Sequence, residues 1–209
     1  MHKSVSNCYS NPKIVSLYQD KKDYGLWKSE EFLISKYFKK YKPILDLGAG
    51  TGRTTFALNK LGYGTIAFDL SYDMVKEVPK SIVANAAKLP FKDKSFENIL
   101  FSYNGICHLE PADNIMMFKE IKRILQKGGI FIFSFQPKHW YQFSKLNWVF
   151  HSGSFQNFQC RFYKLSKNEL KNFIEKENLL VIEEGDKSKF ENDNDQNYPE
   201  SYFFAVKKI

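Results

Sequence analysis

The chain has 209 residues, of which 43% are hydrophobic and 26% charged, and its formal net charge is +8. These proportions are ordinary for a soluble globular protein, and the length suffices for one domain with a buried core. The first ten residues contain no apolar stretch, and the longest apolar run, Ile130–Phe135, is far too short to cross a bilayer. We therefore expect neither a secretory signal nor a membrane span.

The three cysteines, Cys8, Cys107 and Cys160, are odd in number and lie far apart in the sequence. This distribution argues against a disulfide framework and against a zinc site, and it fits a reducing compartment. We therefore predict a cytoplasmic protein with no bound metal and no membrane partner, present as a monomer or a homodimer.

Helices are predicted first, over residues 1–40, where WKSEEFLISKYFKK places apolar residues at helical spacing. Short apolar segments then alternate with helical patterns and read as strands, at 43–47, 65–69, 81–85, 98–102 and 129–135. The helix before the last of these is expected to begin near Pro111 and to end at Gly128–Gly129. This alternation predicts βαβ units and a mainly parallel sheet between layers of helices.

The remaining elements are a helix that Ser166 begins, with Glu169 three residues on, a strand over 179–182 and a final strand over 201–209. No repeat is visible, and linker-like composition is confined to one polar loop. The sequence therefore predicts a single domain over 1–209.

A glycine-rich turn follows the first strand, which ends at Asp46; the glycines are Gly48, Gly50 and Gly52. Such a turn brings bare backbone N–H groups and a helix N-terminus to a ligand, at the strand ends where open α/β sheets bind. Asp69 ends the second strand, where a carboxylate can accept both hydroxyls of a ribose. The spacing D-x-G-x-G-x-G differs from the dinucleotide fingerprint G-x-G-x-x-G, and a carboxylate at Asp46 would repel a pyrophosphate.

DLGAGTG (Asp46–Gly52), Asp69 and NAAKLPFKDKSFENILFS (Asn85–Ser102) together resemble the motifs of class I S-adenosylmethionine-dependent methyltransferases. The resemblance covers roughly residues 27–135, the late helix and the two final strands. It implies an α/β, Rossmann-like, doubly wound sheet of seven strands, mostly parallel with an antiparallel last strand and helices on both faces. It also implies a transferase that uses S-adenosyl-L-methionine and releases S-adenosyl-L-homocysteine.

Carried to this sequence, the resemblance assigns the ribose hydroxyls of the cofactor to Asp69, with Leu70 beside the adenine. The methionine part is assigned to the turn, namely Asp46, Gly48, Ala49, Gly50 and Gly52. Tyr103 would lie near the methionine or the sulfonium.

Asn85 stands where many relatives have an aspartate that accepts a hydrogen bond from the adenine amino group. Its carbonyl oxygen can accept the same bond, although a charged acceptor would be stronger. Ala86 would offer its backbone N–H to the adenine ring.

Methyl transfer from a sulfonium is an in-line displacement, so holding the reactants in line supplies much of the catalysis. A general base is needed only if the acceptor must lose a proton. His108, Tyr103 and His139 are the candidates, and His108 stands where relatives often carry histidine. The alternative for His108 is a structural role.

A basic and aromatic segment follows the fifth strand, with no acidic residue between Glu120 and Glu169. In the family this connection commonly forms a lid, so residues 137–165 are the predicted lid, and residues 1–40 a helical cover. Interleaved rings and cations suggest an aromatic or apolar acceptor with an anionic group. The candidate substrate contacts are Tyr18, Trp27, His139, Trp140 and Arg161. The alternative is that these side chains only pack together or form a dimer contact.

Rival functions stay open beside a small-molecule methyltransferase. Basic and aromatic residues together also fit an RNA or other nucleic-acid methyltransferase. That reading is disfavoured because SYNGIC stands after the fourth strand in place of an Asn/Asp-Pro-Pro-aromatic motif. A non-catalytic S-adenosylmethionine-binding protein is the second rival, and a nicotinamide oxidoreductase, disfavoured by Asp46 and the glycine spacing, is the third.

Overall fold

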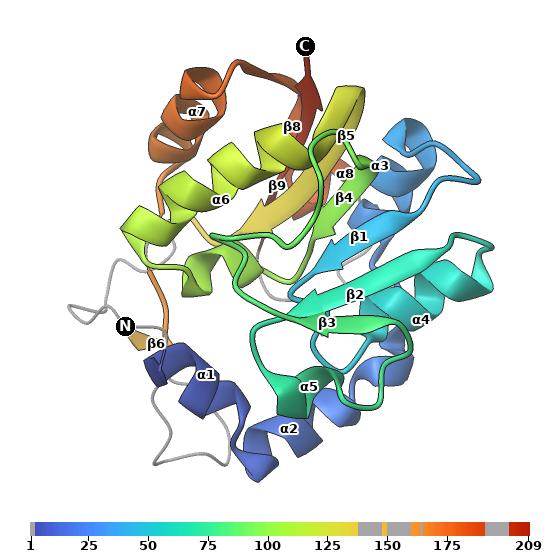
Figure 1. Cartoon of the computed structure of the whole chain (residues 1–209), viewed down its shortest axis with the longest axis vertical. Coiled ribbons are helices and arrows are strands. Elements are labelled where there is room, and N and C mark those ends of the chain that lie inside the picture. Colours follow the sequence, from blue (N-terminus) through green and yellow to red (C-terminus); the bar gives the residue numbers. More distant parts are fainter. Residues whose placement is uncertain (1–2, 138–147, 150–159, 164, 191–200) are drawn as a thin grey trace.

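The computed structural model describes residues 3–137, 148–149, 160–163, 165–190 and 201–209. Its centre is a seven-stranded sheet in the order β3-β2-β1-β4-β5-β9-β8 (Figure 1). The strands are β1 (Ile44–Leu47), β2 (Thr65–Asp69), β3 (Ser81–Val83), β4 (Phe96–Phe101), β5 (Leu125–Phe135), β8 (Leu179–Asp186) and β9 (Tyr202–Lys208). β9 lies antiparallel between β5 and β8, whereas the pairs among β1 to β5 are parallel. The predicted seven-stranded sheet with an antiparallel last strand is confirmed.

Helices join and cover these strands. They are α1 (Lys3–Tyr9), α2 (Pro12–Gln19), η1 (Lys22–Tyr24), α3 (Lys28–Tyr37), α4 (Arg53–Lys60), α5 (Tyr72–Val75), η2 (Gly105–His108), α6 (Pro111–Ile124), α7 (Lys167–Lys176) and α8 (Lys187–Phe190). The predicted lid, 137–165, lies largely outside the described residues. Within it, β6 (Trp148–Val149) and β7 (Cys160–Arg161) form a separate antiparallel pair.

The core has two halves because alternate residues of each strand point to opposite faces of the sheet. On one face, Phe131 and Phe133 of β5 pack edge-on against Phe118 of α6, with ring centroids 6.2 and 5.8 Å apart. On the other, Ile132 clusters with Leu33 of α3 and neighbouring apolar side chains. Figure 1 shows α6 and α7 in front of the sheet and α3 and α4 behind it. Helices therefore cover both faces, as predicted.

Several predicted strand boundaries shift: β3 ends at Val83 rather than at 85, β4 covers Phe96–Phe101 rather than 98–102, and the largest change is between α6 and β5. α6 ends at Ile124, and β5 begins at the next residue, Leu125, rather than after Gly128–Gly129. The reason is that Leu125 already pairs with Phe96 of β4, and the register between the two strands shifts just beyond that pair. Gly128, with φ +78°, supplies a left-handed residue inside the strand instead of a helix end.

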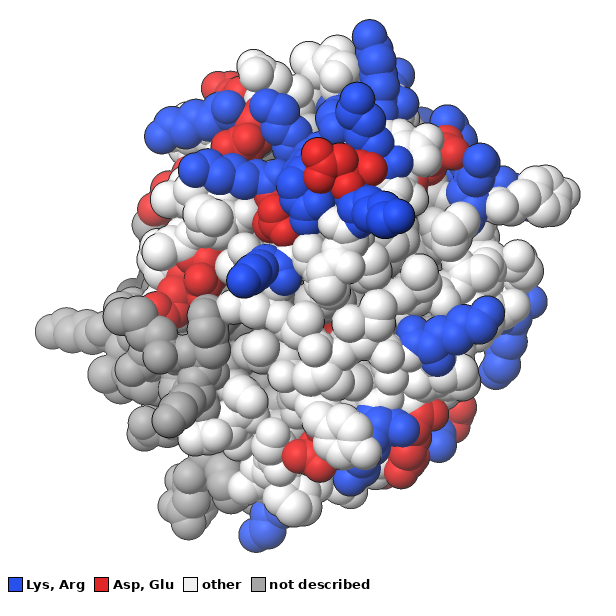
Figure 2. Space-filling model, viewed as in Figure 1, with Lys and Arg blue, Asp and Glu red and all other residues white. Residues whose placement is uncertain are grey.

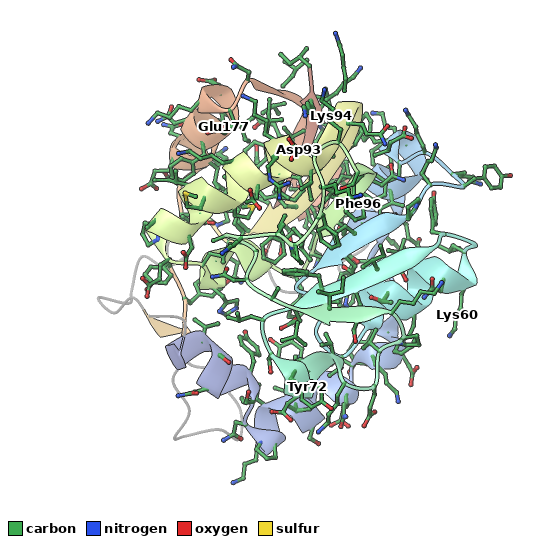
Figure 3. The ribbon with its side chains drawn as sticks, in the orientation of Figure 1. Lys60, Tyr72, Asp93, Lys94, Phe96 and Glu177 are labelled. Carbon is green, nitrogen blue, oxygen red and sulfur yellow. The ribbon has the colours of Figure 1, made fainter. Side chains whose placement is uncertain are left out.

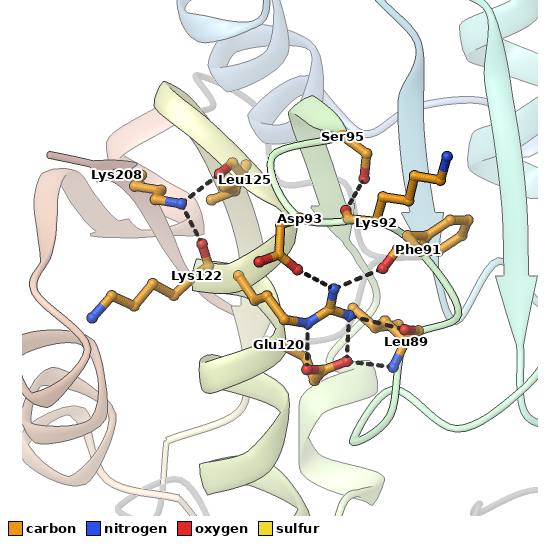
Figure 4. Close-up of polar contacts among 10 residues, drawn as sticks. Leu89, Phe91, Lys92, Asp93, Ser95, Glu120, Lys122, Leu125 and Lys208 are labelled. Carbon is orange, nitrogen blue, oxygen red and sulfur yellow. Dashed lines mark hydrogen bonds and ion pairs between the residues drawn. The ribbon is translucent and has the colours of Figure 1, made fainter.

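The segment between β3 and β4 is fixed to α6 by Arg123 (Figure 4). The Arg123 guanidinium donates to the backbone oxygens of Phe91 and Leu89, at 2.7 and 3.0 Å, and to the carboxylate of Glu120. Glu120 also accepts a hydrogen bond from the backbone N–H of Leu89 at 2.7 Å. These bonds hold the segment between Ala86 and β4 against α6. Figure 3 labels Asp93, Lys94 and Phe96, which lie at the end of this segment and the start of β4.

The basic segment found in the sequence is partly neutralised in the fold. Arg123 pairs with Asp93 and Glu120, and Lys122 lies 3.9 Å from Glu177. Figure 2 shows acidic side chains among the lysines and arginines on this face. The excess of positive charge therefore does not extend as one unbroken patch over the described part of this face.

The structure bears on two expectations, the absence of a membrane span and the absence of disulfides. None of the described helices combines the length and the hydropathy that a bilayer crossing requires. Cys8 is disulfide-bonded, contrary to the expectation from the cysteine count, whereas Cys107 is a free, buried thiol whose pKa burial raises to about 12.

Candidate functional site

A cavity opens at the carboxyl ends of β1, β2 and β4, and its walls come from both halves of the sequence. Most of the predicted site residues line it: Tyr18, Trp27, Gly48, Ala49, Gly50, Asp69, Leu70, Asn85, Ala86, Tyr103 and His108. The parallel strands bring these residues together because their carboxyl ends meet at one edge of the sheet.

The glycine turn has little or no room for side chains at Gly48 and Gly50. Gly48 has φ +62°, and a Cβ there would come within 2.7 Å of the Phe101 ring. Gly50 has φ +56°, and a Cβ there would lie 3.3 Å from the Met74 methyl group. Because the left-handed region is costly for other residues, the turn requires glycine for its backbone as well as for its space. Its backbone is thereby left open to the cavity.

Asp69 joins the second strand to this turn. Its carboxylate accepts hydrogen bonds from the backbone N–H of Gly50 and of Ser71, both at 2.9 Å. Burial raises the pKa of Asp69, while these N–H groups act in the opposite direction. The result is an oriented carboxylate on the cavity wall, beside Leu70.

Asp46 is not among the residues that line the cavity, although the resemblance assigned it to the cofactor. It is 1% exposed and accepts hydrogen bonds from the hydroxyls of Thr54 and Thr55, both at 2.6 Å. Burial raises its pKa to about 6, against the effect of these two bonds. Gly52 likewise does not line the cavity in the described structure. Both residues support the turn and the start of α4.

The loop after β3 contributes Asn85 and Ala86. The Asn85 side-chain oxygen accepts the backbone N–H of Ala87 at 2.9 Å, which closes a local turn. One lone pair of that oxygen is therefore already used by the chain itself.

After β4 the backbone takes an uncommon course. Tyr103 and Asn104 are consecutive residues in the left-handed region, with φ 53° and 58°. Non-glycine residues in this region carry strain and tend to cluster at functional sites. Here the turn directs Tyr103 into the cavity and leads into η2, whose last residue is His108.

The N-terminal helices form the opposite wall. The Tyr9 hydroxyl of α1 lies 2.9 Å from His108 Nε2, and the two rings cross at 89°. Ser71 donates to the backbone oxygen of Tyr9 at 3.0 Å, and Thr51 donates to that of Tyr18 at 2.8 Å. These bonds seat α1 and α2 on the loops after β2 and β1.

Two cationic side chains reach the cavity among its described lining residues, Lys21 and Arg53. Arg53 is held by the Glu30 carboxylate in a buried pair, with N···O distances of 2.9 and 2.7 Å. Lys21 donates to the Tyr103 hydroxyl at 3.4 Å and lies 5.5 Å from the Tyr18 ring centroid. Lys21 thus contacts hydroxyl and aromatic groups, whereas the charge of Arg53 is compensated by the Glu30 carboxylate.

Three predicted substrate contacts fall outside this description. His139 and Trp140 lie outside the described residues, and only the backbone of Arg161 is described, in β7. Conversely, sequence reasoning missed Tyr9, Lys21 and Arg53 as site residues. No local signal marks Tyr9 or Lys21, since their place depends on how the N-terminal helices dock. Arg53 directly follows the glycine turn and could have been found there.

Comparison with known proteins gives a domain assignment for the centre of the chain. Residues 45–133 match the family model described as a methyltransferase domain. An uncharacterised protein of Methanocaldococcus jannaschii is 34% identical over 112 residues, which are 50% of this chain and 41% of that protein. The demethylmenaquinone methyltransferase of Mycobacterium sp. (strain KMS) is 33% identical over 91 residues, covering 41% of this chain and 38% of the relative. The chain thus spans less than half the length of these curated relatives.

Solved structures match nearly the whole chain. An S-adenosylmethionine-dependent methyltransferase from Clostridium acetobutylicum superimposes with a TM-score of 0.70 and 19% identity, over 97% of this chain and 99% of that one. The glycopeptide N-methyltransferase MtfA, solved with S-adenosyl-L-methionine, gives a TM-score of 0.67 at 17% identity, over 89% of this chain and 96% of the other. At these identities the likeness establishes the fold.

Proposed function

Because the chain carries a methyltransferase domain on the class I S-adenosylmethionine-dependent methyltransferase fold, we propose that it transfers a methyl group from S-adenosyl-L-methionine to a small molecule. The observation that carries the proposal is the bond between Asp69 and the N–H of Gly50. It sets a carboxylate and an open glycine turn side by side on one cavity wall, as a ribose and its attached chain require.

The residues on the page fit an adenosyl ligand with a charged amino-acid end. Asp69 would accept the ribose hydroxyls, Leu70 and Ala86 would border the adenine, and the glycine turn would take the methionine part. Lys21 and the Tyr103 hydroxyl, which line the same cavity and contact each other, suit the carboxylate of the amino-acid end. Asp46 would act through Thr54 and Thr55, which hold the turn, rather than by direct contact.

When bound, S-adenosyl-L-methionine supplies an electrophilic methyl group on a sulfonium. The chain contributes position and a dry environment, since aromatic side chains from Tyr18, Trp27 and Tyr103 wall the cavity. His108 would receive a proton where the acceptor loses one, and Tyr103 would lie close to the reacting atoms.

The acceptor we propose has an aromatic or apolar body and an anionic group. Rings on the cavity wall, and the cations of the segment between Glu120 and Glu169, support this class. A relative matching 41% of the chain is named demethylmenaquinone methyltransferase, after a small-molecule acceptor. Residues 137–165 would form the lid over this acceptor, and a cytoplasmic monomer or homodimer remains our prediction.

Thermal unfolding with three ligands tests the cofactor. S-adenosyl-L-methionine and S-adenosyl-L-homocysteine, each at 100 times its dissociation constant, should add about 2.7 kcal/mol to stability. For a chain of this size the midpoint should rise by about 5–10 °C. NAD(P) serves as the matched ligand control and should give no shift.

Each other outcome favours a rival. A shift with NAD(P) alone would favour an oxidoreductase and overturn the proposal. Binding of the adenosyl ligands without turnover of any acceptor would favour a non-catalytic binding protein. Binding to oligonucleotides that weakens strongly with added salt would favour a nucleic-acid methyltransferase.

A further inference from the structure

The pair formed by Tyr9 and His108 joins two distant parts of the chain at the cavity. Tyr9 is the last residue of α1 and His108 the last of η2, 99 positions apart, yet the hydroxyl oxygen lies 2.9 Å from Nε2. Both residues line the cavity that holds the glycine turn and Asp69. A hydroxyl and an imidazole at this distance can pass a proton between them.

The surroundings decide which atom of the pair carries the hydrogen. Tyr9 is half-buried, and desolvation raises the pKa of its hydroxyl well above the usual value; the nearby Tyr18, with which it also hydrogen-bonds, Asp69 and Tyr103 act in the same direction. The phenol therefore keeps its proton, and where Nε2 is the unprotonated nitrogen of the His108 ring, the hydroxyl donates to it.

Other ionisable groups face the same space, and any titration of the pair includes their effect. Asp69 comes from β2, Glu110 precedes α6 and Asp113 lies in its first turn, and all three line the cavity. Lys21 lies on the opposite side, beside the Tyr18 and Tyr103 rings. Carboxylates on this wall favour a positive charge on His108 once it has taken a proton.

Building on the proposed function, we propose that Tyr9 and His108 form a proton relay that deprotonates the acceptor during methyl transfer. The acceptor atom, an oxygen or nitrogen that bears hydrogen, bonds to the methyl carbon as the carbon–sulfur bond breaks and its electron pair stays on sulfur. The acceptor proton passes to the Tyr9 oxygen, and the Tyr9 proton passes to His108 Nε2. The sulfonium charge that disappears is replaced by the charge on the imidazolium, so the cavity keeps its net charge.

The relay narrows the acceptor class. It requires a hydroxyl or N–H group on the aromatic body, in addition to the anionic group. An acceptor methylated on a carboxylate or a tertiary amine would have no proton to give and no use for the pair.

The first test does not depend on turnover. In protein labelled with ¹⁵N-histidine and saturated with S-adenosyl-L-homocysteine, neutral His108 should show an unprotonated Nε2, assigned through a His108→Gln variant. Tyr9→Phe should shift that Nε2 resonance, whereas Tyr72→Phe, at a tyrosine that is 65% exposed (Figure 3), should not. A neutral ring with its proton on Nε2 would overturn the relay, because that nitrogen could accept nothing. This measurement reads the pair in the free protein as well, so it stands even if the adenosyl ligand fails to bind.

The second test uses a matched pair of acceptors, 1-hydroxy-2-naphthoate and 2-naphthoate, and follows release of S-adenosyl-L-homocysteine. Only the hydroxy acid should be methylated, and Tyr9→Phe should lower kcat/KM by about 100- to 10,000-fold with a changed pH profile. Tyr9→Phe should still bind S-adenosyl-L-homocysteine, and Tyr72→Phe should keep the full rate. Turnover unchanged in Tyr9→Phe would refute the relay. Methylation of 2-naphthoate alone, or of neither acid by protein that binds the cofactor, would refute the acceptor class.

Discussion

Arg53 and Glu30 form two parallel hydrogen bonds, at 2.9 and 2.7 Å, between the first turn of α4 and the first turn of α3. Both side chains are buried, and Arg53 also donates to the backbone oxygen of Gly25 at 2.5 Å. Glu30 in turn accepts from the backbone N–H of Trp27 at 2.9 Å. The pair therefore ties the segment before α3 to the helix that follows the glycine turn.

Removal of one partner from this pair should be costly. Glu30→Ala leaves the Arg53 guanidinium buried without its carboxylate, so we expect the free energy of unfolding to fall by about 3–5 kcal/mol. Urea denaturation followed by circular dichroism measures this. The double variant Glu30→Met, Arg53→Met should lose less than Glu30→Ala alone, because neither charge remains. Equal losses in the two would show that packing, not the unpaired charge, sets the cost.

Asp46 gives a pH-dependent prediction. Its folded pKa is about 6, against about 3.9 in an unfolded chain. The folded state thus binds this proton more tightly, so the contribution of Asp46 to stability falls as pH rises from about 4 to about 6 and is level above that. In the parent, the Asp46 contribution to the free energy of unfolding should fall by about 1–3 kcal/mol between pH 4 and pH 7.5, and Asp46→Asn should abolish this change. The variant should match the parent at pH 4 and exceed it at pH 7.5 in urea denaturation, and a constant difference across this range would contradict the assignment.

Gly48 tests the shape of the turn. Gly48→Ala combines a left-handed backbone with a methyl group 2.7 Å from the Phe101 ring, so stability should fall by about 2–4 kcal/mol. Gly62→Ala is the matched control, because Gly62 has φ +84° and open space around its Cβ position. It should lose only about 1 kcal/mol. Differential scanning fluorimetry separates the two, and similar losses would mean that Phe101 moves aside.

Asp69 tests the ribose assignment. Asp69→Ala should weaken binding of S-adenosyl-L-homocysteine by about 1.5–3 kcal/mol, typical of hydrogen bonds to a charged group. Isothermal titration calorimetry gives the affinity. Asp73→Ala removes a nearby carboxylate of α5 that pairs with Lys76 outside the cavity, and its affinity should match the parent. If Asp69→Ala also binds normally, the ribose lies elsewhere.

Local signals were enough to predict the sheet and the turn. Each of β1, β2 and β4 is a short apolar run, and Gly48 and Gly50 stand where their positive φ angles are needed. The end of α6 was predicted wrongly because Gly128 looks like a helix end in sequence. The competing pairing of Leu125 with Phe96 is a long-range contact that no local window contains.

The cavity wall formed by the N-terminal helices also depends on long-range contacts that local sequence does not reveal. Lys21 reaches the cavity only because Thr51 holds the end of α2, and Tyr9 only because Ser71 holds the end of α1. Neither bond has a sequence signature, since serine, threonine and backbone oxygens occur everywhere. The partners of Asp46 are a further case: its spacing suits a ligand, but in the structure its carboxylate accepts hydrogen bonds from two threonines of the next turn.

The distance in sequence between Tyr9 and His108 also sets an order of events during synthesis. At about 5–20 residues per second, the ribosome adds His108 about 5–20 s after Tyr9. Throughout that interval α1 has no partner at this position, and its tyrosine is available to other surfaces, including chaperones. A nascent chain that ends before His108 cannot form the pair, so this wall of the cavity is completed only after η2 has been made.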